Sequence, residues 1–232
     1  MRHRAPTPTH SSLLKTSSPR RGFTLVELLV SVAIILVLAT ALARVGQGMM
    51  DRGRAVHCAK NLREIGVATM AYAGENNMTL PQTSHQRGGK SWTLTLKPYM
   101  DPDAKVIPDF KCPDDRDPTR TYTYLINDFL TPAPAGAPDL NYSYLAKVRC
   151  PEAVMMFAEA AASNKNTDHF HFSDYRGGKI PAEVFAWQVG VEEHAGKANY
   201  LFADGHVETL GWGEVKARLA ADGSSFVDPS VP

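Results

Sequence analysis

The chain has 232 residues, of which 44% are hydrophobic and 21% are charged, and its formal net charge is +1. This length accommodates one domain of ordinary size together with a membrane element. The near-neutral charge argues against a basic nucleic-acid-binding protein, and no nucleic-acid partner is expected. The charge is unevenly placed, because residues 1–22 hold five of the 25 basic side chains and none of the 24 acidic ones. A basic leader before a mildly acidic remainder is typical of an exported protein whose leader stays in the cytoplasm.

An apolar segment follows this leader at residues 23–43. Its 21 residues are close to the roughly 20 that a helix needs to cross a bilayer. Glu27 lies near its start, and the next charge is Arg44. An ionisable group inside such a span costs about 2.5–3.5 kcal/mol on insertion scales, so Glu27 is expected to have a function and a partner. Because the arginines precede the span, the C-terminal part is expected outside the inner membrane.

Three explanations compete for residues 1–43. A secretory signal peptide would be cut at the small residues 39–43, and an ordinary signal anchor would need only the arginines and the apolar run. Neither explains Glu27, nor Gly22 at the junction of charge and hydrophobe. Residues 22–27, with the sequence GFTLVE, resemble the cleavage and methylation signature of type IV pilins and of the pseudopilins of type II secretion. The resemblance implies cleavage between Gly22 and Phe23 by a prepilin peptidase, N-methylation of Phe23 and assembly with other pilin or pseudopilin subunits.

Glu27 and Phe23 gain complementary roles in this interpretation. The amino group freed at Phe23 has an unperturbed pKa near ~8 and is largely cationic at neutral pH. If a neighbouring subunit is staggered so that its Phe23 amine meets Glu27, each charge offsets the other and the axial register is set. The alternative is that Glu27 is protonated or reaches the membrane interface.

Beyond Arg44, apolar residues at steps of three and four predict that residues 44–74 continue the helix as an amphipathic one. Gly46, Gly48 and Gly53 lie in this part, and they indicate either a hinge or close helix packing. Residues 92–96 alternate like a strand, although a short helix fits equally. The other expected elements are strands at 121–126 and 153–158, a hairpin of 198–203 and 206–210 with a two-residue type I′ turn at Asp204 and Gly205, and a short helix at 214–221. Residues 222–232 are expected to be frayed.

These elements predict an α+β fold: a long N-terminal helix, transmembrane and then periplasmic, packed on a small antiparallel sheet in a head of residues 75–221. That architecture is also what the pilin resemblance implies.

A second resemblance joins the two ends of the chain. Cys58 and residues 59–66, the KCPDD run at 111–115, and His194 with Asp204 and Gly205 are similar to a large bacterial family of pilin-like proteins. In these proteins a histidine is followed, after nine residues, by Asp-Gly. The structural interpretation is that His194 hydrogen-bonds a loop or caps the hairpin beside Asp204. The functional interpretation is a cation site formed by His194, Asp204 and His206, together with His169 or His171. No ligand spacing matches a known metal motif, so no cofactor is expected.

Three cysteines in an oxidising compartment allow one disulfide and one remaining thiol. Cys58–Cys112 would pin the loop to the helix and is the favoured pair, while Cys112–Cys150 stays open. Catalysis is a poor fit, because no nucleophile motif accompanies His194 and Asp204. We therefore expect a structural subunit, anchored by a single pass in the inner membrane with its head periplasmic or extracellular. The alternative is a membrane-anchored periplasmic or surface binding protein that keeps the pilin-type leader and never polymerises.

Overall fold

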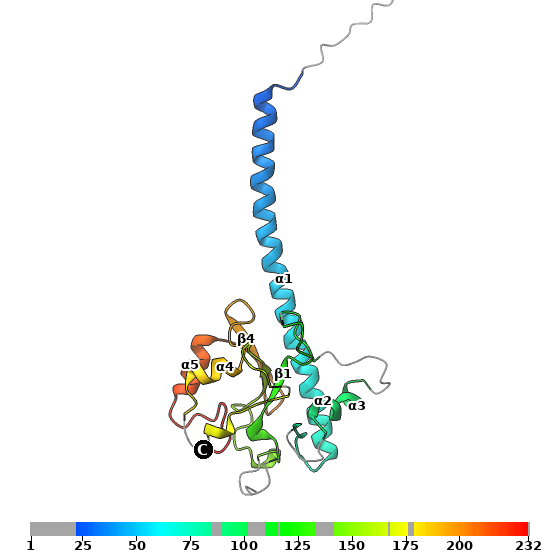
Figure 1. Ribbon diagram of the computed structural model, residues 1–232, viewed down its shortest axis with the longest axis vertical. Helices are drawn as coiled ribbons and strands as arrows, with labels where there is room; N and C mark the ends of the chain where they lie inside the picture. The colour runs from blue at the N-terminus through cyan, green and yellow to red at the C-terminus, as the bar shows by residue number, and fades with distance from the viewer. Residues whose placement is uncertain are drawn as a thin grey trace, which may run out of the picture. The chain divides into compact units, whose positions relative to one another are not determined.

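The computed structural model describes residues 22–84, 90–101, 110–115, 117–132, 142–166, 168–175 and 179–231 (Figure 1). The predicted leader, apart from Gly22, lies outside these ranges. The chain divides into two compact units, residues 1–46 and 47–232. Helix α1 runs over Leu25–Glu75, 51 residues, and contributes to both. The continuous helix that the apolar and amphipathic patterns predict is therefore confirmed.

In the second unit, one face of α1 is buried. Cys58, Leu62, Ile65 and Thr69 are buried and Tyr72 is partly buried, which are the positions that the three- and four-residue spacing predicts. Gly66 lies on this face in close contact with the sheet. A Cβ atom added at Gly66 would lie 2.9 Å from Cδ1 of Leu201, so a larger residue would require the Leu201 side chain to shift.

The second unit contains a five-stranded sheet in the order β3-β1-β2-β4-β5. The strands are β1 (Tyr124–Asn127), β2 (Met155–Glu159), β3 (His169–Phe170), β4 (Lys197–Phe202) and β5 (Val207–Gly211). Neighbouring strands are antiparallel except β1 and β3, which are parallel. The α+β class is confirmed, but the sheet is mixed and not wholly antiparallel.

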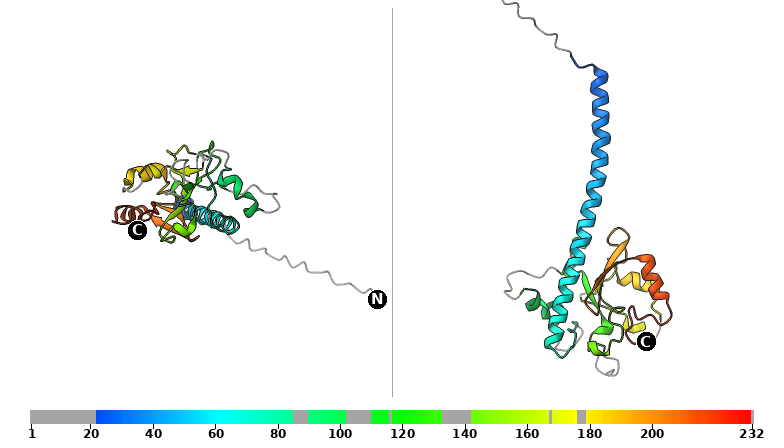
Figure 2. Two further views of the ribbon diagram at one scale, coloured as in Figure 1. Left: turned by 90° about the horizontal axis from the view of Figure 1, so that it is seen from below. Right: turned by 180° about the vertical axis from the view of Figure 1, so that it is seen from behind.

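Apolar side chains cover both faces of this sheet. Tyr124, Ile126 and Leu201 pack with the buried face of α1, whereas Leu125 and Tyr200 belong to a second core on the opposite face. Figures 1 and 2 show α4 (Ala182–Gln188) and α5 (Trp212–Ala220) on that opposite side. Residues 92–100 form the two short helices α2 (Trp92–Thr95) and α3 (Lys97–Met100), so the helical alternative holds there. Single 3₁₀ turns lie at Asp128–Leu130, Leu145–Lys147 and Ser173–Tyr175.

The hairpin between β4 and β5 forms where the Asp-Gly pair predicts it, but its turn is of another kind. Only Gly205 has a positive φ, of 94°, and Asp204 has none. The Gly205 amide donates to the Phe202 carbonyl, and the Phe202 amide donates to the His206 carbonyl. The loop is therefore a three-residue turn with glycine in the left-handed position, and the two-residue type I′ turn predicted from sequence is wrong.

The C-terminal tail packs against the sheet, so the prediction that residues 222–232 are frayed is wrong. Phe226 and Val227 are buried in the second core, the Met155 amide donates to the Phe226 carbonyl, and the Asn127 side chain donates to the Val227 carbonyl. The tail has few apolar residues, but Phe226 and Val227 are enough to fix it, because their burial removes apolar surface from water.

Asp168 ties a surface segment to the start of β3. Its carboxylate accepts hydrogen bonds from the Ser84 amide at 2.6 Å and the Ser91 hydroxyl at 2.6 Å, and Nδ1 of His169 lies 2.7 Å away. Burial alone would raise the pKa of Asp168. The hydrogen bonds from His169, Ser91 and Ser84 outweigh this and hold the pKa below its usual range.

Candidate functional site

The start of α1 places Glu27 against Thr24. The Thr24 amide and hydroxyl donate to Oε2 of Glu27 at 2.9 and 2.8 Å, and the Glu27 amide donates back to the Thr24 hydroxyl at 3.2 Å. This reciprocal arrangement is a helix-capping box, which places the carboxylate at the positive end of the helix dipole. The Thr-x-x-Glu spacing of this cap is readable in the sequence, although a partner within the chain was not among the expectations for Glu27. Gly22 and Phe23, on either side of the predicted cut, lie just before the cap and are exposed.

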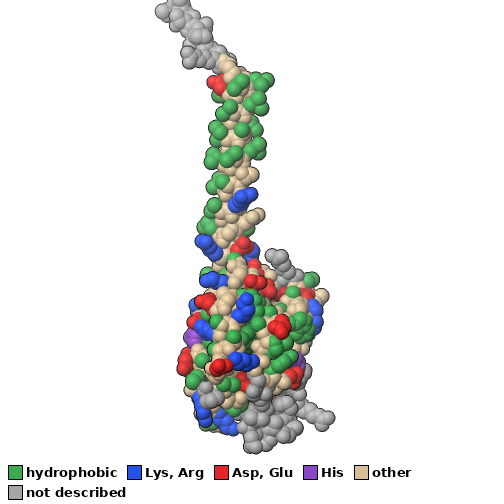
Figure 3. All heavy atoms as spheres, turned by 90° about the vertical axis from the view of Figure 1, so that its left-hand side faces the viewer, with side chains coloured by type: hydrophobic (Ala, Val, Ile, Leu, Met, Phe, Trp, Pro, Cys, Tyr) green, Lys and Arg blue, Asp and Glu red, His purple; other side chains and the backbone are tan. Residues whose placement is uncertain are grey.

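Helix α1 begins with a long exposed apolar surface. It is the one helix in the described residues that is long and apolar enough to cross a membrane, and the side chains of its most apolar stretch are all exposed. In Figure 3 hydrophobic side chains follow this stretch, with an acidic side chain near its start. An apolar surface of this extent requires a bilayer or neighbouring helices to cover it.

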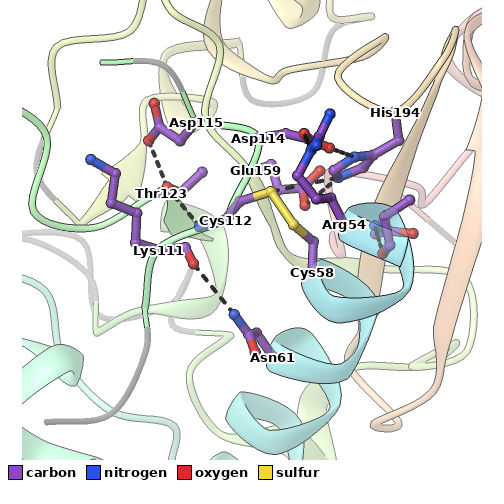
Figure 4. The surroundings of a disulfide bond; sticks show 12 residues. Arg54, Cys58, Asn61, Lys111, Cys112, Asp114, Asp115, Thr123, Glu159 and His194 are labelled. Carbon is purple, nitrogen blue, oxygen red and sulfur yellow. Dashed lines mark hydrogen bonds and ion pairs between the residues drawn. A yellow bond between two sulfur atoms is a disulfide. The ribbon is translucent and has the colours of Figure 1, made fainter. Parts of the chain in front are cut away.

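A second candidate site lies inside the head, where four separate segments meet (Figure 4). Helix α1 supplies Arg54 and Cys58, and the loop before β1 supplies Cys112 and Asp114. The last residue of β2 is Glu159, and His194 comes from the turn before β4. Cys58 and Cys112 form a disulfide, which is the pair favoured from sequence, and Cys150 is a free thiol.

Hydrogen bonds hold the cysteine loop in place. The Cys112 amide donates to the Thr123 hydroxyl at 3.1 Å, and that hydroxyl donates to Asp115 at 2.6 Å. From the helix side, the Asn61 amide group donates to the Lys111 carbonyl at 3.4 Å. Because both flanks of Cys112 are fixed, the loop presents its sulfur and the Asp114 carboxylate toward His194, as Figure 4 shows.

His194 lies between two carboxylates. Its Nδ1 is 2.8 Å from Oδ2 of Asp114 and its Nε2 is 2.9 Å from Oε1 of Glu159, and the imidazole is only 1% exposed. Arg54 forms an ion pair with Asp114 from the other side. The row of alternating charges therefore begins at the rim of the head and ends at Glu159, which is fully buried.

Burial and pairing act in opposite directions on these groups. Burial favours neutral imidazole, but the hydrogen bonds and charges of Glu159 and Asp114 outweigh it and raise the pKa of His194. Burial raises the pKa of Glu159, and the pairing with His194 offsets this only in part. The pair thus shares a proton that neither residue loses readily.

One comparison with known proteins bears on the N-terminal segment. The prokaryotic N-terminal methylation motif matches residues 17–43, which include the Gly22–Phe23 junction, Glu27 and the apolar run. This motif, followed by the long apolar helix, supports a type IV pilin-like protein. The family of this motif is structural and not enzymatic, and the motif implies processing by a prepilin peptidase. No curated protein and no solved structure matches the pilin-like chain.

Of the two structural roles expected for His194, the hydrogen bond to a loop is present and the position beside Asp204 is not. The hydrogen-bond partners of His194 are Asp114 and Glu159, while Asp204 accepts from the ring of His206 at 2.6 Å. The reason is geometric: β4 lies between the two residues, and its six residues span roughly 17 Å at about 3.3 Å each. His169 pairs with Asp168 instead, so the cation site predicted around Asp204 and these histidines is not assembled in the described residues.

Two members of the buried site were missed in the sequence. Glu159 ends an apolar strand and Arg54 lies in the glycine-rich part of α1, so no local motif marks either. The sequence resemblance groups Cys58, the KCPDD run and His194, and the structure brings these three segments together.

Proposed function

We propose that this pilin-like chain is a pseudopilin or minor pilin. It is cut after Gly22, N-methylated at Phe23 and assembled through its N-terminal helix into a type II secretion or type IV pilus-like filament. The observation that carries the proposal is the methylation motif on a helix whose apolar surface is wholly exposed in the single chain. Neighbouring helices and lipid would cover that surface, and the head would lie on the periplasmic side or on the filament.

Glu27 would set the register of assembly by accepting the Phe23 amine of a neighbouring subunit. The capping box offers the competing role, because Thr24 already bonds Glu27 within one chain. A capping role alone would suit the alternative function, a membrane-anchored binding protein that does not polymerise.

The N-terminal sequence of the mature protein is the first test. A mature chain that begins at Phe23 supports the proposal, and a chain that keeps residues 1–22 or begins near residue 40 overturns it.

Two matched variants then separate assembly from capping. Glu27→Ala removes both the cap and the charge, whereas Thr24→Val removes the hydroxyl that completes the cap and keeps the carboxylate. Both should insert in the membrane, and cross-linking should recover filament oligomers from Thr24→Val but not from Glu27→Ala. Normal oligomers from Glu27→Ala would refute the pairing, and equal loss in both variants would assign Glu27 to the cap.

A further inference from the structure

The buried site in the head contains the side chains of a metal centre. Ligand atoms of Cys58, Cys112, Glu159 and His194 all lie within 4.8 Å of one another, and all four residues are buried. We propose that these four residues bind one Zn²⁺ ion when the Cys58–Cys112 disulfide is reduced, so that the site alternates between a disulfide and a zinc centre. Two thiolates with one imidazole and one carboxylate form a tetrahedral set of the kind that zinc prefers.

The geometry needs only a small adjustment. Zinc bonds of about 2.0–2.3 Å place tetrahedral ligands roughly 3.3–3.8 Å apart. Sγ of Cys112 is already 3.7 Å from Nε2 of His194, and Oε1 of Glu159 is 2.9 Å from the same nitrogen. The main change is the separation of the two sulfurs once their bond is broken.

The groups around His194 and Glu159 also favour these two residues as metal ligands. Nδ1 of His194 faces Asp114, and Asp114 is held by Arg54, so Nε2 is directed toward the cysteines. A carboxylate behind a histidine in this way fixes the tautomer and orients the ring at metal centres. Oε2 of Glu159 is buried without a hydrogen-bond partner in the described residues, an arrangement that a cation would satisfy.

A route to the site exists. A cavity of about 300 Å³ is lined by Cys112, Asp114 and Glu159 together with Asp115, Asp117 and Glu193. Among the described residues that line it, Arg120, which pairs with Asp115, is the basic one. An acidic cavity that is lined by Cys112 and Glu159 would concentrate divalent cations next to the site.

The replacement of the disulfide by zinc is balanced in electrons and protons. A two-electron reductant breaks the Cys58–Cys112 bond and leaves two thiols. A dithiol supplies two electrons and two protons and becomes a disulfide itself, whereas a phosphine supplies the two electrons and becomes a phosphine oxide, with water giving the oxygen and the two protons. Zn²⁺ then displaces one proton from each thiol and the proton shared by His194 and Glu159. Zinc thus replaces a proton between two side chains that are already in contact, and the site does not depend on whether the chain polymerises.

The test uses the full chain in detergent, reduced with a phosphine without oxygen and dialysed first against Zn²⁺ and then against metal-free buffer. Mass spectrometry should find about one zinc per reduced chain and essentially none on the oxidised chain. A reduced chain that keeps no zinc, or an oxidised chain that keeps as much, overturns the proposal. Co²⁺ in place of zinc should give the thiolate-to-metal absorption of a tetrahedral site.

Variants identify the ligands. His194→Ala and Cys58→Ser should lose the bound metal, and Asp114→Asn should keep it with about 10–100-fold lower affinity. Cys150→Ser and His206→Ala are matched controls, which remove the free thiol and the exposed histidine and should bind as the wild type does. Circular dichroism checks that each chain is folded. Zinc retained at full affinity by His194→Ala, or lost from His206→Ala, contradicts the assignment whatever the other variants do.

Discussion

Substitution of His194 by alanine should destabilise the oxidised head strongly. The variant leaves Glu159, which is fully buried, without the cation that partners it, while Arg54 still compensates Asp114. Breaking a buried pair by removing one partner costs about 3–5 kcal/mol of unfolding free energy. For a domain of this size about 1 kcal/mol corresponds to about 2–4 °C, so the melting temperature should fall by about 6–20 °C.

Urea unfolding of the chain in detergent, followed by the fluorescence of the buried Trp92, measures this loss with the disulfide intact. His206→Ala is the matched control, because its ion pair with Asp204 is more than one-third exposed on both sides. It should cost no more than about 1 kcal/mol. If His194→Ala costs as little as His206→Ala, the buried ion pair is not what stabilises this part of the head.

A double-mutant cycle isolates the pair itself. Glu159→Gln removes the buried charge and keeps the shape of the side chain, so His194→Ala should cost about 1–3 kcal/mol less in that background than in the wild type. Additive costs would mean that His194 and Glu159 are not coupled. The explanation of the raised pKa of His194 would then be wrong as well.

Three further predictions concern the fold. Alkylation without reductant should label Cys150 alone, and reduction of the disulfide, whose cysteines are 54 residues apart, should cost about 4 kcal/mol of unfolding free energy. Asp168 has a lowered pKa in the folded chain, so its stabilisation is present above the ordinary carboxyl pKa near ~3.9 and is lost as the pH falls through the folded value. The stability of Asp168→Asn, measured by acid titration, should therefore decline less steeply than the wild type below about pH 4. Gly66→Ala should lower the melting temperature, because overpacking costs about 1–3 kcal/mol of unfolding free energy. Gly53→Ala should raise the melting temperature, because its added Cβ meets nothing within 4 Å and alanine adds up to ~1 kcal/mol of helix propensity. Two shifts of the same sign would contradict the packing argument.

The sequence predicts the elements that carry a long or regular pattern. The 51 residues of α1, the apolar strand β2 and the β4–β5 hairpin follow from periodicity and turn residues alone. By contrast, β3 has two residues and α4 has seven, too few for a period to be seen, and β3 owes its strand conformation to parallel pairing with β1. The elements that were missed are those whose structure depends on tertiary contacts.

The same distinction applies to the two candidate sites. The expected processing site is local, so Gly22, Phe23 and Glu27 are readable from six consecutive residues. The buried site depends on side chains up to 140 residues apart, because Arg54 and His194 meet only through Asp114. A spacing motif such as His194 to Asp204 invites a local explanation, and the strand between them rules that explanation out.

The capping box sharpens what Glu27 can do in an assembled filament. Both donors of Thr24 bind the same oxygen, Oε2, and a carboxylate has about four acceptor sites on its two oxygens. Oε1 is therefore left to accept an amine, and the cap holds the carboxylate near the end of the helix where a neighbouring Phe23 would arrive. Under the proposed function, capping and assembly reinforce each other, since the cap orients the acceptor before the subunits meet. Thr24→Val should accordingly slow assembly without abolishing it, and faster assembly in this variant would show that the cap competes with the neighbouring amine.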